Sequence, residues 1–277
     1  MTIQIFKNVE DYLTSSLQFL EQREIENNIT IGICTNLSLK KTEKSSTIFI
    51  NVLEENKIIV SSILTSTKLL ISSIENSNES TRLIVEYLKD NHIKVPGVFV
   101  ETKHACYFEN AYLDKLTTKK ELMVHQLINI EEQQLADGTF NLANLEDIEI
   151  LSAFRFNFQE ETKTLPNYSR LEINDICYSL IKNNLFYTWK VNGVIVSCSA
   201  MIRSTKNIGV VGMVYTPPAL RGKGYARSCV QELSKHILRN GFSSCGLFTD
   251  QSNPISNHLY KSIGYKPIAS FCDIEFL

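Results

Sequence analysis

A short segment of the second half, Val214 to Ala226, restricts the fold more than any other part of the chain. An apolar, β-branched run over Ile208 to Tyr215 predicts a buried strand, and Pro217-Pro218 prevents that strand from continuing. A glycine-rich loop begins at Arg221, and apolar residues then recur at helical spacing as far as Asn240-Gly241. Main-chain N–H groups at such a strand-loop-helix junction can bind an anion. The segment therefore predicts an α/β fold with an anion site, and pyrophosphate is the expected occupant.

The spacing of this loop separates it from better-known phosphate loops. Neither the P-loop pattern nor the dinucleotide pattern Gly-x-Gly-x-x-Gly is present. The loop reads Arg221-x-x-Gly224-x-Ala226, which resembles the acyl-CoA pyrophosphate loop of the GNAT superfamily of N-acetyltransferases, Gln/Arg-x-x-Gly-x-Gly/Ala. On this pattern alone, a tight turn without a ligand stays open as the alternative.

A second segment downstream, Asn257 to Pro267, supports the same resemblance. A strand over Ser243 to Thr249, a turn, and a helix over Ile255 to Ile263 are predicted ahead of Gly264. The helix resembles the second cofactor motif of the family, in which a Tyr lies four residues before a Gly-aromatic pair. In that family the Tyr protonates the departing CoA thiolate, so the resemblance implies a catalytic role for Tyr260. A tyrosine that merely packs on a helix face is the alternative.

The resemblance also implies which residues bind acetyl-CoA. The predicted strand would separate from its neighbour, so that the main chain of Val214 and Thr216 can pair with the pantetheine arm. Asn253 resembles the family residue that hydrogen-bonds this arm, and Ser256 either touches the cofactor or only caps the helix. Arg221 either contacts a phosphate or caps the turn. The expected cofactor-binding residues are Val214, Tyr215, Thr216, Arg221, Gly222, Lys223, Gly224, Tyr225, Ala226, Asn253 and Ser256.

Composition favours a cytoplasmic enzyme without metal. The chain has 277 residues, 43% of them apolar, which is enough for two domains. A formal net charge of -2 argues against a nucleic-acid surface. The sequence contains no long uncharged apolar stretch, so neither a membrane span nor export is expected. The seven cysteines are scattered and never spaced Cys-x-x-Cys, and the five histidines are equally dispersed. This distribution favours reduced thiols over disulfides or a metal site.

The two halves of the sequence resemble each other. The segment Asn56 to Ile63 matches Asn192 to Ser199, and each is followed by Ser-Thr-Lys. We interpret this as a duplicated fold, although unrelated hairpins can also look alike. In the first half, Glu75 to Thr81 stands where the phosphate loop should be, with no glycine and two carboxylates. The expected domains are therefore residues 1–135, which lack the cofactor site, and residues 136–277, which contain it.

The expected fold class is α/β (α+β), with two GNAT-like mixed, twisted sheets in tandem, each flanked by helices. In the second domain the predicted order begins with helices over 145–160 and 171–182, followed by a hairpin around Asn192-Gly193. The strand that leads to the loop, the helix after it, and a strand-helix-strand series that ends over 268–276 complete the domain. This order is that of the GNAT fold.

The resemblance implies transfer of an acetyl group from acetyl-CoA to a primary amine of a small molecule, with a protein amine less favoured. The amine would attack directly, Tyr260 would act as general acid, and a main-chain N–H near Val214 or Tyr215 would stabilise the oxyanion. The predicted strand over 208–215 carries no carboxylate, so no base is assigned. Helix carboxylates on the acceptor side are read as solvated charges, and these are Glu160, Glu161, Glu172 and Asp175. The alternative function is a non-catalytic CoA-binding or sensing protein, and a monomer is favoured over a dimer.

Overall fold

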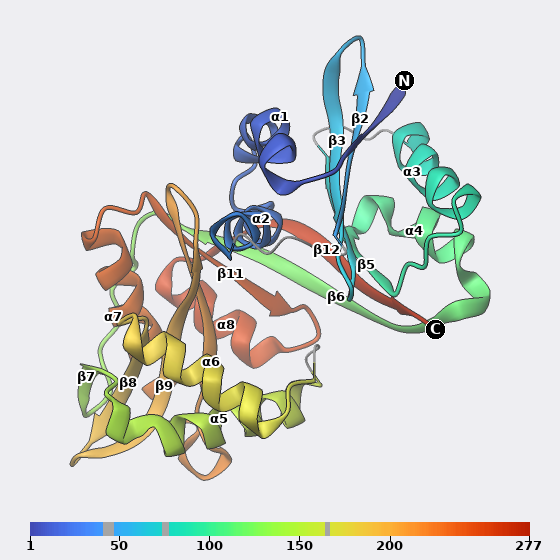
Figure 1. Ribbon diagram of the computed structural model, residues 1–277. Helices are drawn as coiled ribbons and strands as arrows, with labels where there is room; N and C mark the ends of the chain where they lie inside the picture. The colour runs from blue at the N-terminus through green and yellow to red at the C-terminus, as the bar shows by residue number, and fades with distance from the viewer. Residues whose placement is uncertain (41–46, 74–77, 164–166) are drawn as a thin grey trace. The chain divides into compact units, whose positions relative to one another are not determined.

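The computed structural model describes residues 1–40, 47–73, 78–163 and 167–277, which form two compact units (Figure 1). The first unit comprises residues 1–124, 249–253 and 267–277, and the second comprises residues 125–248 and 254–266. The units thus do not divide at residue 135, because two segments from the end of the chain group with the first unit. None of the described helices is both long and apolar enough to span a lipid bilayer.

The first unit is a mixed sheet with helices packed on it. Its strands follow the hydrogen-bonded order β1-β2-β3-β4-β5-β12-β6. Its elements are β1 (Thr2–Phe6), α1 (Val9–Glu21), α2 (Asn28–Lys40), β2 (Ile48–Glu54), β3 (Lys57–Leu64), β4 (Leu69–Ser73), α3 (Asn78–Asp90), β5 (Gly97–Glu101), α4 (Thr102–Ala111), a 3-10 turn (Leu113–Lys115), β6 (Leu116–Leu127) and β12 (Lys266–Phe276).

The core of the first unit lies where α3 and α4 cover the sheet. Ile84 and Leu88 of α3 recur at helical spacing and are fully buried, together with Phe108 of α4. Against them lie the inward residues of the strands, including Ile50 and Val98. Burial of these apolar side chains is what holds the helices on the sheet.

The second unit repeats this layout. Its strands follow the order β6-β11-β10-β9-β8-β7, where β6 contributes its last residues. Its elements are β7 (Thr139–Leu142), a 3-10 turn (Leu145–Asp147), α5 (Ile148–Thr162), α6 (Arg170–Lys182), β8 (Phe186–Val191), β9 (Val194–Ser204), β10 (Ile208–Tyr215), a 3-10 turn (Pro218–Leu220), α7 (Tyr225–Arg239), β11 (Ser244–Asp250) and α8 (Pro254–Ile263).

Local signals explain most of these boundaries. Asn144 caps the predicted helix start, where its side chain accepts from the main-chain N–H of Glu146 at 2.9 Å. The predicted hairpin turn is present at Asn192-Gly193, both with positive φ. In the first unit the corresponding turn uses Glu55 and Asn56, so the two asparagines matched in sequence occupy different turn positions.

The last strand corrects one expectation. The sequence pattern placed residues 268–276 in the second domain, but β12 pairs antiparallel with β5 of the first unit, with Ile274 opposite Val98. Alternate residues of β12, namely Cys272, Ile274 and Phe276, are buried in the core of the first unit. The sequence predicted a strand with alternating apolar residues, but it did not predict the sheet in which this strand pairs.

Candidate active site

The end of β10 separates from its parallel neighbour β11. Three residue pairs are in register, from Ile208 opposite Ser244 to Val210 opposite Gly246, and the register stops there. The remaining part of β10 runs on to Tyr215 along its other neighbour, β9. This leaves main-chain N–H and C=O groups of β10 facing a gap, which an extended ligand can enter by adding hydrogen bonds to the strand edge.

A β-bulge marks the same stretch of β10. Gly212 lies opposite Ala200 and Tyr215 opposite Cys198, so β10 carries one extra residue between these pairs. Met213 in the bulge has a φ of 52°, which is unfavourable for a residue with a side chain. Such strain inside a strand is found at functional sites, where it turns a main-chain group toward a ligand. Gly212, a glycine inside the strand pattern directly before Met213, is the sequence signal that could have indicated this bulge.

The loop after β10 has the backbone that the glycine pattern predicts. Gly222 and Gly224 both have a φ of 79°, and Gly224 immediately precedes α7. A side-chain Cβ on Gly222 would meet no atom within 4 Å, and one on Gly224 would make only ordinary contacts. The backbone angle, and not crowding, therefore requires glycine at these positions. The first N–H groups of α7 have no partner within the helix and carry the positive end of its dipole.

The neighbouring residues of the loop have different surroundings. Lys223 is exposed, Tyr225 packs beside Trp189 and Cys229, and Ala226 is half-buried at the start of α7. The main-chain N–H of Arg221 donates to the carbonyl of Pro218 at 3.3 Å, so this group already has a partner inside the turn. The main-chain N–H groups that remain for an anion therefore begin after Arg221, one residue later than expected.

The side chain of Arg221 is held by the protein itself. Its Nε donates to the carbonyl of Thr216 at 2.9 Å, and its Nη2 lies 2.6 Å from Oε2 of Glu161 at the end of α5. The other oxygen of Glu161 accepts from the hydroxyl of Tyr215 at 2.7 Å. Glu161 is therefore not the solvated charge that the sequence suggested, because it ties α5 to the end of β10.

These contacts set the protonation of both acidic groups. Burial alone would raise the pKa of Glu161, but the hydrogen bonds from Arg221 and Tyr215 outweigh it and lower this pKa. Burial, with the neighbouring carboxylate, raises the pKa of the Tyr215 phenol to about 12. At neutral pH the site therefore holds a carboxylate and a protonated phenol, and the carboxylate has no tendency to take up a proton.

Tyr260 lies on α8 and is 8% exposed, in an apolar cluster with Val211, Leu233 and Leu247. Val214 of β10 packs against the same cluster, so the fold brings the expected catalytic residue to the strand that carries the bulge. Tyr265 contacts its ring edge-on at 5.9 Å between centroids. Burial raises the pKa of the Tyr260 phenol, which keeps the hydroxyl protonated at neutral pH.

Two expected cofactor residues lie near the start of α8. Ser256 is in the first turn of this helix and is half-buried. Asn253 directly precedes the helix and groups with the first unit, and its main-chain N–H donates to the carbonyl of Asp250 at 3.1 Å. Among the remaining predicted residues, Thr216 is 8% exposed and its hydroxyl donates to Ser197 at 2.8 Å.

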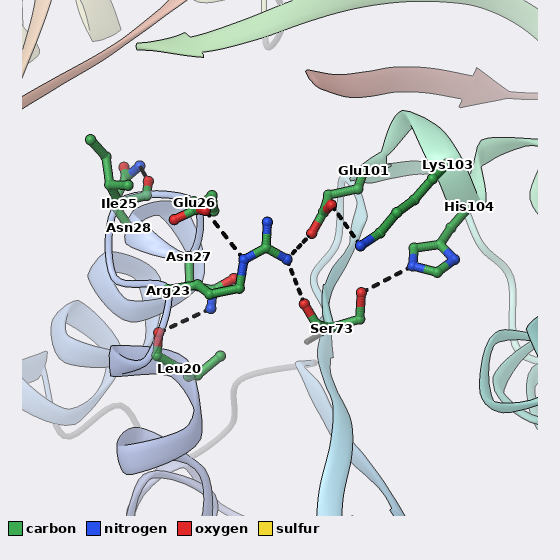
Figure 2. A network of polar contacts seen from close by, with 10 residues as sticks. All are labelled: Leu20, Arg23, Ile25, Glu26, Asn27, Asn28, Ser73, Glu101, Lys103 and His104. Carbon is green, nitrogen blue, oxygen red and sulfur yellow. Dashed lines mark hydrogen bonds and ion pairs between the residues drawn. The ribbon is translucent and has the colours of Figure 1, made fainter. Parts of the chain in front are cut away.

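The first unit has a corresponding gap, but a side chain crosses it. β4 and β5 are in parallel register only at Leu69 opposite Val98 and Leu70 opposite Phe99. Beyond this point Arg23 donates to the carbonyl of Ser73 at 2.7 Å and forms an ion pair with Glu101 (Figure 2).

Further polar contacts fix this bridge. Lys103 lies 3.0 Å from the second oxygen of Glu101, and Nε of Arg23 lies 3.2 Å from Glu26 (Figure 2). The expected loop counterpart, Glu75 to Thr81, falls partly outside the described residues, which resume at Asn78 with the start of α3. Sequence reasoning missed Arg23, because no local pattern connects it to strand ends far along the chain.

Comparison with known proteins agrees with this geometry. Residues 147–265 match the model of the acetyltransferase (GNAT) family. No match was found among curated proteins. Among solved structures, a GNAT-family acetyltransferase from Colwellia psychrerythraea is 13% identical, with 100% of both chains covered and a TM-score of 0.63.

Two further structures extend the likeness. A GNAT-type N-acetyltransferase from Sphaerobacter thermophilus is 13% identical over 88% of this chain and 85% of its own, with a TM-score of 0.61. A tandem GNAT protein from the clavulanic acid biosynthesis pathway is 9% identical over 99% of this chain and 98% of its own, with a TM-score of 0.58. At these identities the likeness is one of fold. The expected fold class, two GNAT-like sheets in tandem, is thus confirmed.

Proposed function

We propose, from the premise that residues 147–265 form an acetyltransferase domain of the GNAT family, that this enzyme acetylates a primary amine of a small molecule. Domains of this family are acyltransferases that use acetyl-CoA as the acetyl donor. The observation that carries the proposal for this chain is the gap between β10 and β11, which is followed by the left-handed glycines and the start of α7. A protein amine is the less favoured acceptor.

Three groups of residues fit acetyl-CoA, and all of them except Asn253 belong to the second unit. The free edge of β10, with Val214 and Thr216, suits an extended pantetheine arm. The N–H groups from Gly222 to Ala226, at the start of α7, suit a pyrophosphate. Near the start of α8, Asn253 and Ser256 are proposed to bind the pantetheine arm.

The proposed chemistry uses two groups of the chain. Bound acetyl-CoA supplies a thioester, whose carbonyl carbon the neutral amine attacks. A main-chain N–H at the bulge around Met213, Val214 and Tyr215 donates to the carbonyl oxygen as it gains negative charge. The attack forms the C–N bond, and the nitrogen then loses a proton to solvent. Tyr260 donates its phenolic proton to the sulfur as the C–S bond breaks, and it regains a proton from solvent after the thiol leaves.

We assign no side chain as general base. β10 carries no carboxylate, and Glu161 is a poor candidate because Arg221 and Tyr215 lower its pKa. An amine that arrives neutral, or that loses its proton through water, requires no such residue. The lack of a carboxylate on β10 is the one observation that favours the second candidate function, a CoA-binding protein without turnover.

Release of CoA thiol in a screen of small primary amines separates the two functions. We expect amine-dependent release by the wild-type chain. Tyr260→Phe should reduce kcat by about 100-fold or more, as loss of a general acid does, with little change in affinity for acetyl-CoA. Tyr178→Phe, on the exposed face of α6, is the matched control and should keep the full rate. A wild-type rate that Tyr260→Phe leaves intact would refute the mechanism, and absence of release with every amine would favour the binding protein.

Two further proposals concern the setting of the enzyme. All seven cysteines have free thiols, and six of them are buried. This supports the proposal that the protein works in a reducing compartment, for which the cytoplasm is our choice. We also propose that the chain acts as a monomer, since it already contains two units of the fold.

A further inference from the structure

An open pocket of about 830 Å³ lies in the first unit, at the ends of α3 and α4. It is formed entirely by residues of that unit, and none of its described lining residues is an aspartate or glutamate. Lys89, Lys94 and Lys115 line it, together with His92. Three ammonium groups around one concave surface create a positive field that attracts an anion.

The three lysines are not committed to other charges. Among the described residues none of them forms an ion pair, in contrast to Lys103 and Lys119 nearby, which each contact a glutamate. The ammonium of Lys89 lies instead over the ring of Tyr112, 5.2 Å from its centroid. The charges of this pocket are therefore free to bind a ligand.

The end of α3 does not require these lysines either. Its last carbonyls accept from the main chain that follows, because Ile93 donates to Leu88 at 2.9 Å and His92 donates to Lys89 at 3.0 Å. The left-handed residue that completes this cap is His92, with a φ of 54°, where glycine is the usual residue. The chain thus retains a histidine at the rim of the pocket in an unfavourable backbone conformation.

A buried hydroxyl in the pocket wall lacks a partner. Tyr112 lines the pocket and is 8% exposed, and its hydroxyl is buried with no hydrogen bond to any described residue. Its ring is fixed by stacking on Phe276, 4.9 Å between centroids. Because this hydroxyl is buried, an acceptor in the open pocket cannot reach it, and Tyr112 contributes only its ring to the pocket wall, with the Lys89 ammonium over it.

We propose that this pocket binds a small organic phosphate. The lysines would hold the phosphate dianion, and apolar residues such as Ile93, Val95 and Leu113 would contact the organic part. The volume suits a ligand of small-molecule size. This site lies outside the 147–265 acetyltransferase domain and is independent of the proposed acetyl-CoA site.

Calorimetric titration of the full chain with 1-naphthyl phosphate tests the proposal, with acetyl-CoA present at saturation so that its site is unavailable to the probe. We expect one probe molecule per chain. Lys94→Gln and Lys115→Gln should each weaken binding about tenfold, as expected for the loss of a charged hydrogen bond. Lys57→Gln and Tyr107→Phe, outside the pocket, should leave the affinity unchanged.

Two reference ligands identify what is recognised. 1-Naphthol lacks the charge and inorganic phosphate lacks the apolar body, so both should bind much more weakly than the probe. No probe binding by a chain that still binds acetyl-CoA would overturn the proposal. An affinity for 1-naphthol equal to that for the probe, or wild-type probe affinity in both lysine variants with unchanged thermal unfolding, would also overturn it.

Discussion

Individual residues with a left-handed backbone define the candidate active site more sharply than its charged residues do. Met213 stores strain in the bulge of β10, and Gly222 and Gly224 turn the loop toward the start of α7. Glycine accepts this conformation without cost, whereas methionine does not. The glycines were visible in the sequence as a pattern. The strain at Met213 was not, because it arises from the register between β10 and β9.

Gly224→Val should separate the binding role of this glycine from its backbone role. Gly193→Val is the matched control, since Gly193 has the same φ of 79° in the turn between β8 and β9. Both changes should lower the free energy of unfolding by about 1–3 kcal/mol, measured in urea. Only Gly224→Val should weaken acetyl-CoA binding, by about tenfold or more, since it displaces the N–H groups proposed to contact the pyrophosphate oxygens. Equal affinities in the two variants would contradict the assignment of the loop.

The Glu161-Arg221 pair predicts a pH-dependent contribution to stability. The pKa of Glu161 is lowered in the folded chain, so its contribution is present above the unfolded pKa of about 4.3 and is lost as the pH falls through the folded value. Both side chains are substantially exposed, 39% for Glu161 and 49% for Arg221, so we expect a coupling of only about 0.5–1 kcal/mol at pH 7.

A double-mutant cycle measures this coupling. Glu161→Gln, Arg221→Gln and the double variant should show it in urea unfolding at pH 7, and the coupling should decrease as the pH falls below the unfolded pKa of Glu161 and vanish once the carboxyl group is protonated. A coupling that is absent at pH 7, or that persists unchanged in acid, would show that the pair does not connect α5 to the loop.

At the scale of elements, the two strand gaps have the same origin but different contents. β10 and β4 each separate from a parallel neighbour after a few residue pairs. In the second unit the gap borders glycines and a helix start, whereas in the first unit Arg23 and Glu101 meet across it. The lack of glycine in the first-half loop predicted that this half has no cofactor site. That Arg23 crosses the gap between β4 and β5 could be seen only in the folded structure.

Arg23→Gln should destabilise the first unit. Glu101 is only 11% exposed in its side chain and would keep Lys103 as its single cationic partner. We expect the free energy of unfolding to fall by about 1–3 kcal/mol, since the change leaves a largely buried carboxylate less well compensated. Arg82→Gln breaks an exposed pair with Glu86 on α3 and should cost at most about 0.5 kcal/mol. Equal losses in urea unfolding would contradict a structural role for Arg23.

Element types were largely predictable from local signals, and their partners were not. The Asn192-Gly193 turn, the Asn144 cap and the strand ahead of Pro217 depend on neighbouring residues, so the sequence alone indicates them. The pairing of β12 with β5 depends on which of two apolar sheets accepts an alternating strand. Such a choice is made by packing across the whole fold, and local periodicity carries no information about it.

For the whole molecule, we infer that a chain with two units of one fold has a single acetyl-CoA site, in the second unit. The two units provide two strand gaps, and within the described part of the chain only that of the second unit combines a free strand edge with a glycine loop and a helix start. The first unit would then contribute stability and the proposed anion pocket, and no acyl transfer.

Calorimetric titration with acetyl-CoA tests this claim most directly, because it counts sites. We predict one acetyl-CoA per wild-type chain, one per chain in Arg23→Gln, and loss of most binding in Gly224→Val. Two molecules bound per wild-type chain, or full binding by the Gly224→Val variant, would contradict the account.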